Sequence, residues 1–455
     1  MVNHRIAGKS IEEWIESKPV LDNIIHTKEV FWNNPEKKPF TEAAKKTSLT
    51  KEDIKDAKDR LQRFASFIEL VFPETERTNG LIESGISPIP EIKKHLEGLY
   101  ETTIQGSYYL KRDDTLPIVG TIKARGAIYE VLKHAETLAL ENGLLKSKQE
   151  DYAVFASQSF KDFFSHYKIT VGTTGNLGIS VGTMGSMLGF EVIVHMSVEA
   201  KKWKKEFLKS RGVTVIEHKT NFTKAVEEGR KESDQDPFSY FVDDEHSVDL
   251  FLGYTTAGDR LKQQLDNEGV FVDADHPLFV YLPCGIGGSP GGVSFGLKQI
   301  YGDNVHCFFA EPTHMPSMLI GLITNQHDSV SVSDFNIDGK TAADGLAVPR
   351  TSGFVSKIMR NFFSGGYSVQ DEEIYRLLTD LTDKENIFLE PAAIAGLPGA
   401  ARLFSTPEGK EYIATHHLED KMSQATHIAW ATGGSLVPLS DREEFLISSK
   451  QETTS

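Results

Sequence analysis

The chain is poor in cysteine, with only Cys284 and Cys307 in 455 residues. So few cysteines exclude a disulfide framework and a cysteine-rich zinc site, and they favour a reducing, cytoplasmic setting. No stretch approaches the roughly 18 consecutive apolar residues that a membrane span needs. The first residues, MVNHRIAGKSIEEWIESKP, have no apolar core and no cleavage signature, so we predict no signal peptide.

An excess of positive charge is also absent. Lysine and arginine number 49 against 65 acidic residues, which gives a formal net charge of −16. That balance disfavours a DNA or RNA partner, although one local site could still hold a small anionic cofactor. We therefore expect a small-molecule substrate, no nucleic-acid or membrane partner, and a monomer or weak oligomer.

The order of local patterns indicates an α/β fold. Residues 1 to about 105 are mostly helical in pattern, and strand patterns alternate with helical ones after that, which predicts βαβ units and parallel sheets. We predict that 160–248 forms a small α/β domain. The segment 1–159 would hold a helical extension and the first part of a larger domain, and 249–455 the remainder. A cleft between two such units is a common ligand location.

A glycine-rich segment, PCGIGGSPGG at 283–292, follows the strand-like LFVYLP and precedes a helical pattern. Glycine lets the backbone approach a ligand, and a helix N-terminus offers free N–H groups, so this segment predicts a phosphate site. The spacing of Gly285 and Gly287 also loosely matches a dinucleotide fingerprint, with Glu311 at the end of the next strand, where a ribose-binding acid would be. A nicotinamide-dependent dehydrogenase is therefore an alternative, although Pro290 fits that fingerprint poorly.

A second candidate is the turn in VGTTGNLGISVG, 171–182. Thr173, Thr174 and Asn176 place hydroxyls and an amide between a strand and a helix, where free N–H groups would add to them. Such a set suits a carboxylate ligand. An ordinary helix cap, with Asn176 in a turn, is the alternative.

The third candidate is Lys123 in VGTIKARGAIYEVL. Thr121 would cap the helix and place Lys123 in its first turn. The positive end of the helix dipole and the nearby Arg125 both disfavour an ammonium there. An uncharged lysine amine can form a Schiff base, whereas an ordinary surface lysine is the alternative.

Two further segments are a strand-like one that ends at Thr432 and a strongly basic one at 201–207. The strand-like IAWATGGS ends at Thr432, whose hydroxyl could face the nitrogen of a bound ring or simply belong to a turn. The segment KKWKKEF, 201–207, is strongly basic, and we interpret it as a solvated helix face.

Together these segments resemble the fold-type II pyridoxal-phosphate enzymes and, within them, the D-serine dehydratase (D-serine ammonia-lyase) family. The resemblance extends over residues 50 to about 440. It is carried by KRDDTLPIVGTIKARGAIYEVL, TGNLG, FVDDEHSVDLFLGY, LPCGIGGSPGGVSFGLK, FAEPTHMPSMLIGL, TAADGLAV and WATGG. The fold class it implies has two α/β domains with parallel-type sheets.

The resemblance implies pyridoxal 5′-phosphate as the cofactor and β-elimination of D-serine to pyruvate and ammonia as the reaction. Lys123 would be the Schiff-base lysine and the general base, and Glu311 would belong to a monovalent-cation site for K⁺ or Na⁺. The remaining implied ligands are Asn176, Gly285, Ile286, Gly287, Gly288, Ser289 and Thr432 for the cofactor, and Thr173 and Thr174 for the substrate carboxylate.

The substrate hydroxyl has two candidate partners, Asp243 and Tyr254, for which packing at a hinge is an equal alternative. D-threonine is a possible second substrate. An L-serine or L-threonine dehydratase of the same fold is an alternative, because L-specific relatives carry the same lysine, asparagine and glycine loop.

Overall fold

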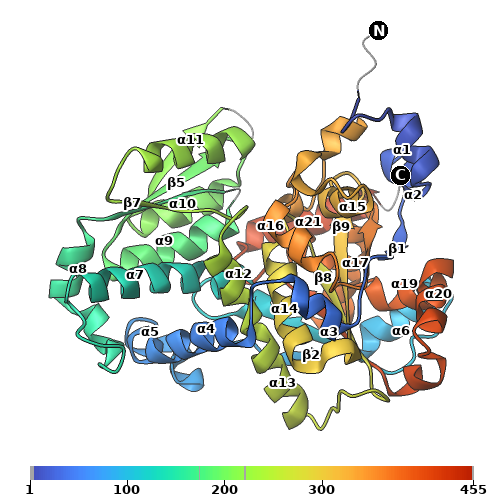
Figure 1. The fold of residues 1–455 in the computed structure, drawn as a ribbon, viewed down its shortest axis with the longest axis horizontal. Coiled ribbons are helices and arrows are strands. Elements are labelled where there is room, and N and C mark those ends of the chain that lie inside the picture. The colour runs from blue at the N-terminus through green and yellow to red at the C-terminus, as the bar shows by residue number, and fades with distance from the viewer. Residues whose placement is uncertain (1–4, 174, 220–221, 453–455) are drawn as a thin grey trace. The chain divides into compact units, whose positions relative to one another are not determined.

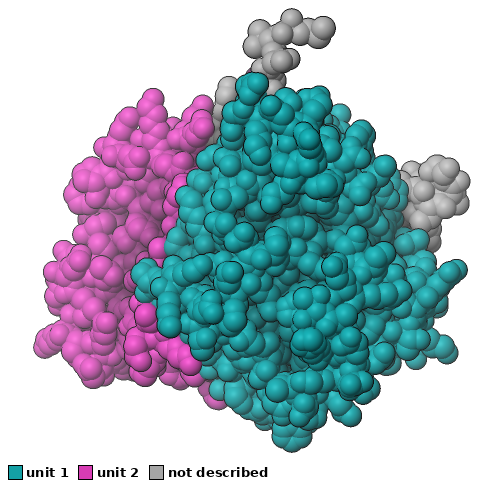
Figure 2. Space-filling model, turned by 45° about the vertical axis from the view of Figure 1, so that its right-hand side comes forward, with its two compact units in different colours: residues 1–49, 85–114, 257–455 teal, residues 50–84, 115–256 magenta. Residues whose placement is uncertain are grey.

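The structure is a computed structural model that describes residues 5–173, 175–219 and 222–452, without the side chains of 222–225 and 448–452. The chain divides into two units (Figure 2). Unit 1 comprises Met1–Leu49, Gly85–Asp114 and Ala257–Ser455, and unit 2 comprises Thr50–Ser84 and Thr115–Thr256. Among the described residues, no helix is long and apolar enough to cross a bilayer.

Unit 1 is built on a seven-stranded sheet in the order β1-β10-β9-β8-β11-β3-β2. The five inner strands are parallel, and the edge strands β1 and β2 run antiparallel to their neighbours. The strands are β1 (Phe31–Asn33), β2 (Ile86–Pro88), β3 (Ser107–Arg112), β8 (Leu278–Pro283), β9 (Val305–Pro312), β10 (Gly365–Val369) and β11 (Thr426–Ala431). Every residue of β8, β9 and β11 is buried, as expected for parallel strands covered on both faces.

Helices cover this sheet and enclose its core (Figure 1). They are α1 (Ile11–Ser17), α2 (Val20–Ile25), α3 (Phe40–Ala43), α6 (Pro90–Leu99), α13 (Ala257–Asn267), α14 (Gly288–Tyr301), α15 (Ser317–Ile323), α16 (Gly353–Met359), α17 (Asp371–Glu385), α18 (Pro391–Ile394), α19 (Gly399–Ser405), α20 (Pro407–Thr415) and α21 (Leu439–Glu452). A second apolar cluster joins Trp14 of α1 and Leu21 of α2 to Leu319 of α15. The N-terminal segment is therefore part of the packed body of unit 1.

Unit 2 has a four-stranded parallel sheet in the order β6-β5-β4-β7. In the view of Figure 1, α9 lies below this sheet and α11 above it. The strands are β4 (Lys168–Gly172), β5 (Glu191–Ser197), β6 (Thr214–His218) and β7 (Ser239–Val242). The helices are α4 (Lys51–Arg63), α5 (Ala65–Val71), the π-helix η4 (Ala124–Ile128), α7 (Tyr129–Glu141), α8 (Gln158–Phe164), α9 (Asn176–Leu188), α10 (Lys202–Ser210), α11 (Phe222–Asp234) and α12 (Val248–Thr255).

The segment 160–248, predicted as a small domain, lies inside unit 2 and contains its whole sheet. Unit 2 also includes α4, α5 and α7, and largely buried ion pairs join α4 to α7. Glu136 of α7 accepts hydrogen bonds from Arg60 at 2.7 Å and from Arg63 at 2.6 Å. This network holds α7, the helix that follows Lys123, against α4. The boundaries of an independently folding domain stay a prediction.

Candidate active site

The glycine-rich segment forms the turn between β8 and α14. Gly287 has a φ of +109°, a region that only glycine adopts readily, and a Cβ there would lie 2.3 Å from Cε of Met318. The first-turn N–H groups of α14, which begins at Gly288, have no carbonyl partner one turn earlier in the helix. A turn of this kind presents backbone donors and the positive end of a helix, which fits a phosphate group.

Glu311 and Thr432 lie at the same edge of the unit 1 sheet as this turn. Strand β8 is flanked by β9 and β11, so the carboxyl ends of these three parallel strands are neighbours. Glu311 is the last residue but one of β9, and Thr432 directly follows β11. Unit 1 therefore brings the glycine loop, Glu311 and Thr432 to one edge, as parallel strand order requires.

The Glu311 carboxylate has structural partners that the sequence analysis did not foresee. It is completely buried, and its two oxygens accept hydrogen bonds from the N–H groups of Met318 and Leu319, each at 2.8 Å. It thus caps the start of α15. Burial raises the pKa of Glu311 to about 8, although both hydrogen bonds act to lower it. Its assignment to a monovalent cation stays a prediction.

In unit 2 the predicted turn follows β4, the neighbour of β7. The Thr173 hydroxyl oxygen accepts the N–H of Gly175 at 3.0 Å, and Asn176 is the first residue of α9. This bond closes a local turn just before α9 with the hydroxyl oxygen of Thr173 as the acceptor, so the Thr173 hydroxyl proton is still able to reach a ligand. Thr174 lies outside the described residues. The carboxylate-binding role of this turn stays a prediction.

Lys123 lies directly before the π-helix η4, with its side chain 18% exposed. Its Nζ donates to Oδ2 of Asp244 at 3.3 Å. Arg125, which the sequence analysis treated as a repelling charge, is ion-paired to Glu83 at 2.6 Å. The ammonium of Lys123 therefore faces a carboxylate from a residue that the sequence analysis did not name.

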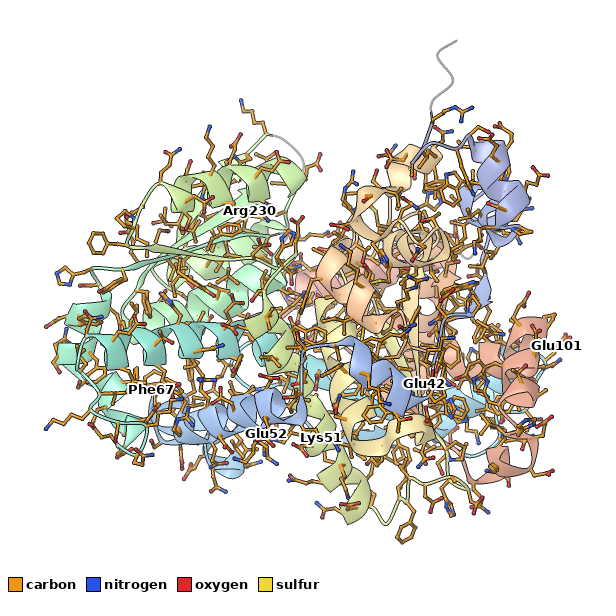
Figure 3. All side chains as sticks on the ribbon, in the orientation of Figure 1. Glu42, Lys51, Glu52, Phe67, Glu101 and Arg230 are labelled. Carbon is orange, nitrogen blue, oxygen red and sulfur yellow. The ribbon has the colours of Figure 1, made fainter. Side chains whose placement is uncertain are left out.

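The pair Asp243 and Asp244 follows β7, and its two members have different surroundings. Asp243 is ion-paired to Arg230 of α11 at 3.0 Å and contacts His246 (Figure 3 labels Arg230). Asp244 contacts Lys123, and its Oδ1 is buried without a hydrogen-bond partner among the described residues. The consecutive acids at the end of a strand were the only sequence signal for this position, and they did not reveal which carboxylate reaches the lysine.

Tyr254 of α12 is fully buried beside η4. Its ring fills the space that a side chain at Gly126 would need, because a Cβ there would lie 2.5 Å from Cε2 of the tyrosine. Its hydroxyl has no hydrogen-bond partner in the described part of the chain. Burial raises the pKa of Tyr254 well above its usual range, and the Asp244 and Glu130 carboxylates add to this, so the phenol is a neutral donor. Unpaired buried polar atoms beside Lys123 fit a polar ligand.

The interpretation of KKWKKEF as a solvated helix face is wrong for two of its lysines. Lys204 and Lys205 of α10 are only 3% and 7% exposed. Lys205 donates to the Val198 carbonyl and to Glu217, each at 2.7 Å. The Lys204 side chain crosses the predicted carboxylate turn, since a Cβ at Gly175 would lie 3.0 Å from its Nζ.

Comparison with known proteins identifies the class of protein. The family model described as "Pyridoxal-phosphate dependent enzyme" matches residues 90–417. This chain belongs to that family, and its cofactor is pyridoxal 5′-phosphate. The alternative of a nicotinamide-dependent dehydrogenase is not favoured. Each unit by itself fits a part of this cofactor. Unit 1 has a turn suited to a phosphate group, and unit 2 has a lysine beside Asp244, whose Oδ1 is buried without a hydrogen-bond partner among the described residues.

Individual relatives show which members of this family the chain is similar to. The chain is 54% identical over 428 residues to a "Probable D-serine dehydratase" of Geobacillus stearothermophilus, covering 94% of this chain and 93% of the relative. It is 56% identical over 430 residues to one of Bacillus cereus strain 03BB102, covering 94% and 96%. Diaminopropionate ammonia lyase from Escherichia coli in complex with D-serine shares the fold, with a TM-score of 0.69 at 17% identity over 94% of this chain and 99% of that one.

The two aspartates after β7 allow a test of the site. We expect Asp244→Asn to lower kcat about tenfold, because the amide no longer holds the Lys123 amine by charge. Asp243→Asn is the matched control and should lower thermal stability while leaving kcat within about twofold, since its partner is Arg230. Steady-state kinetics and thermal melts of both variants check this. If Asp243→Asn lowered kcat more than Asp244→Asn does, the pairing of Asp244 with Lys123 would not be the one that matters for turnover.

Proposed function

We propose that this protein is a D-serine ammonia-lyase, which converts D-serine to pyruvate and ammonia. The observation that carries the proposal is the 54–56% identity, over 94% of the chain, to relatives named as probable D-serine dehydratases. The D-serine complex of a structural neighbour adds that this fold accommodates that amino acid. An L-serine or L-threonine dehydratase is the remaining alternative on the same fold.

The proposed roles are divided between residues of unit 2 and residues of unit 1. Lys123 carries the cofactor and acts as the general base. The turn from Gly285 to Ser289, including Ile286, Gly287 and Gly288, binds the cofactor phosphate. Asn176 and Thr432 bind the cofactor ring, and Thr173 and Thr174 bind the substrate carboxylate.

In the proposed mechanism the amine of Lys123 takes the proton from Cα of D-serine. When bound, the cofactor delocalises the negative charge that develops at Cα. The carbon–oxygen bond at Cβ then breaks and the hydroxyl takes up one proton to leave as water, which balances the proton removed from Cα. The released enamine regains one water on hydrolysis, which gives pyruvate and ammonia, so the net reaction balances. Asp244 keeps the Lys123 amine in position, at 3.3 Å in the structure.

The substrate hydroxyl is the group for which Asp243 and Tyr254 were candidates. The phenol of Tyr254 is buried and has no partner among the described residues, so we propose it as the donor to that hydroxyl. The carboxylate of Asp243 is engaged by Arg230 and His246, so we propose that Asp243 has the structural role and does not contact the substrate hydroxyl.

Several finer points belong to the same proposal. D-threonine is a slower substrate that yields 2-oxobutyrate, and Glu311 contributes to a site for K⁺ or Na⁺. We also propose a cytoplasmic enzyme that is a monomer or weak oligomer.

The substrate proposal is tested by comparing enantiomers. We expect pyruvate release from D-serine to exceed that from L-serine at least tenfold in kcat/KM, which corresponds to about 1.4 kcal/mol of transition-state discrimination. The physical reason is that Lys123 addresses one face of Cα, so inversion moves the proton away from the base. A coupled assay of pyruvate under identical conditions gives both values. Faster turnover of L-serine would overturn the substrate while leaving the lyase chemistry intact.

A further inference from the structure

Unit 1 contains a cavity with charged and histidine side chains in its lining, at the amino ends of β8 and β9. It has a volume of about 390 Å³ and is lined by Lys37, Lys38, Asp303, His306, His416 and Lys421, among others. We propose that this cavity binds a small hydroxylated organic phosphate.

The cavity is separate from the predicted phosphate turn. Lys298, near the end of α14, donates to the Val305 carbonyl at the start of β9 at 2.6 Å, beside the cavity residue His306. The glycine loop lies at the opposite end of the 14-residue helix α14. At 1.5 Å per residue, a helix of that length separates its ends by about 20 Å.

Lys37 and Lys38 belong to a segment whose backbone is hydrogen-bonded to the rest of unit 1. The Asn34 amide donates to the Arg360 and Phe363 carbonyls at 2.8 and 3.0 Å. The Lys38 N–H donates to the Asn361 carbonyl at 3.0 Å, and the Asn361 amide donates back to the Glu36 carbonyl at 2.7 Å. The backbone that carries Lys37 and Lys38 is therefore fixed without using their ammonium groups.

The carboxylates of the cavity already have backbone partners. Both oxygens of Asp303 accept the N–H of Phe40, the first residue of α3, at 3.0 and 3.2 Å; Figure 3 labels Glu42 on the same helix. Asp273 accepts the N–H groups of Asp275 and His276 at 2.8 and 3.0 Å. Neither carboxylate forms an ion pair with Lys37 or Lys38 within the described part of the chain, so the two ammonium groups are open to an anion. Burial lowers the pKa of Lys37, although Asp303 acts to raise it, and an added anion would offset that cost.

The two histidines present hydrogen-bond acceptors to the same space. His416 Nδ1 donates to the Tyr412 carbonyl at 2.9 Å, which leaves its Nε2 as an acceptor. His306 is 3% exposed, and its Nδ1 lies 2.8 Å from the Tyr412 hydroxyl, which itself donates to Ser364. Nδ1 of His306 is thus the donor and Nε2 the acceptor. Burial lowers the pKa of His416 to about 4, with Lys37 and Lys298 adding to this, so its ring stays neutral.

The ligand class follows from these groups. Two ammonium groups recognise a phosphate, and two neutral imidazole acceptors recognise hydroxyl donors. A short polyol that carries a phosphate has both an anionic group for the lysines and hydroxyl donors for the histidines. Inorganic phosphate has only the anionic group. Glycerol 3-phosphate is the smallest convenient probe of this class.

The test is calorimetric titration of the cofactor-loaded enzyme with glycerol 3-phosphate at constant ionic strength. We expect saturable binding that is at least tenfold tighter than that of inorganic phosphate, and none with glycerol. Lys37→Met/Lys38→Met should weaken it at least tenfold. The matched control is Lys45→Met/Lys46→Met, which removes the same charge from exposed lysines of the same N-terminal segment and should change little.

His416→Phe provides a second variant if the lysine pair fails to fold. The phenyl ring retains stacking on Tyr412, where the ring centroids are 4.0 Å apart, but lacks the Nε2 acceptor. We expect it to lose the preference for glycerol 3-phosphate over inorganic phosphate. The proposal is overturned if the wild type shows no saturable binding, if both lysine pairs weaken it equally, or if neither variant changes it. D-serine turnover is measured in parallel and reports separately on the proposed lyase activity.

Discussion

Replacing Lys123 with alanine is expected to lower D-serine turnover by at least about 10³-fold, because it removes both the covalent attachment of the cofactor and the base at Cα. Affinity for the cofactor should fall less than turnover does, since the phosphate turn of unit 1 is unchanged. Pyruvate release measures the first effect, and equilibrium dialysis of pyridoxal phosphate measures the second.

The control for this prediction is Lys133→Ala. Lys133 lies ten residues after Lys123, on α7, and, like Lys123, is ion-paired to an aspartate, Asp249. Because this ion pair is partly exposed and belongs to no proposed ligand site, the variant should keep turnover within about twofold of the wild type. If Lys123→Ala retained a large fraction of wild-type activity, the assignment of the reactive lysine would be wrong.

Replacing Gly287 with valine is expected to weaken pyridoxal phosphate binding about 100-fold, or roughly 2.7 kcal/mol. Valine is strained at a φ of +109°, and its Cβ would lie 2.3 Å from Cε of Met318 and 3.4 Å from Cγ1 of Val355. The start of α14 must therefore move, and with it the N–H groups that we propose bind the phosphate. Titration of the apoenzyme with cofactor gives the dissociation constant.

Gly269→Val separates this effect from simple backbone strain. Gly269 also has a positive φ, +70°, but a Cβ there meets nothing within 4 Å. Its valine variant should lose stability, by about 1–2 kcal/mol, while binding the cofactor normally. Equal losses of cofactor affinity in both variants would show that the effect of Gly287→Val is a general loss of stability and not a change in the phosphate turn.

Much of the fold followed from local patterns. The buried strands β8, β9 and β11 are continuous apolar runs, and such runs are typical of parallel sheets whatever surrounds them. The glycine turn was predictable because its conformational demand is local: a residue with φ of +109° between a strand and a helix must be glycine. Likewise, the placement of Glu311 at the same edge of the sheet as that turn follows from strand order and chain direction.

Side-chain partners between distant segments could not be predicted in this way. Asp244 lies 121 residues after Lys123, and local pattern does not distinguish it from Asp243. Lys204 and Lys205 have the composition of a solvated face, yet the path of α10 over the sheet of unit 2 buries them. The helix-capping contacts of Glu311 could not be predicted either, because they depend on how α15 packs against β9.

The sequence by itself determined the α/β class, the phosphate turn, the reactive lysine candidate and the resemblance to pyridoxal-phosphate enzymes, because each depends on residues that are close together in the chain. Only the tertiary structure decided which carboxylate faces Lys123, which polar atoms of Tyr254 and Asp244 are buried without partners, and that Lys37 and Lys38 share a cavity with His306 and His416. The physical reason is that charge pairing and burial depend on distances in space, and chain segments hundreds of residues apart acquire those distances only when the sheets are assembled.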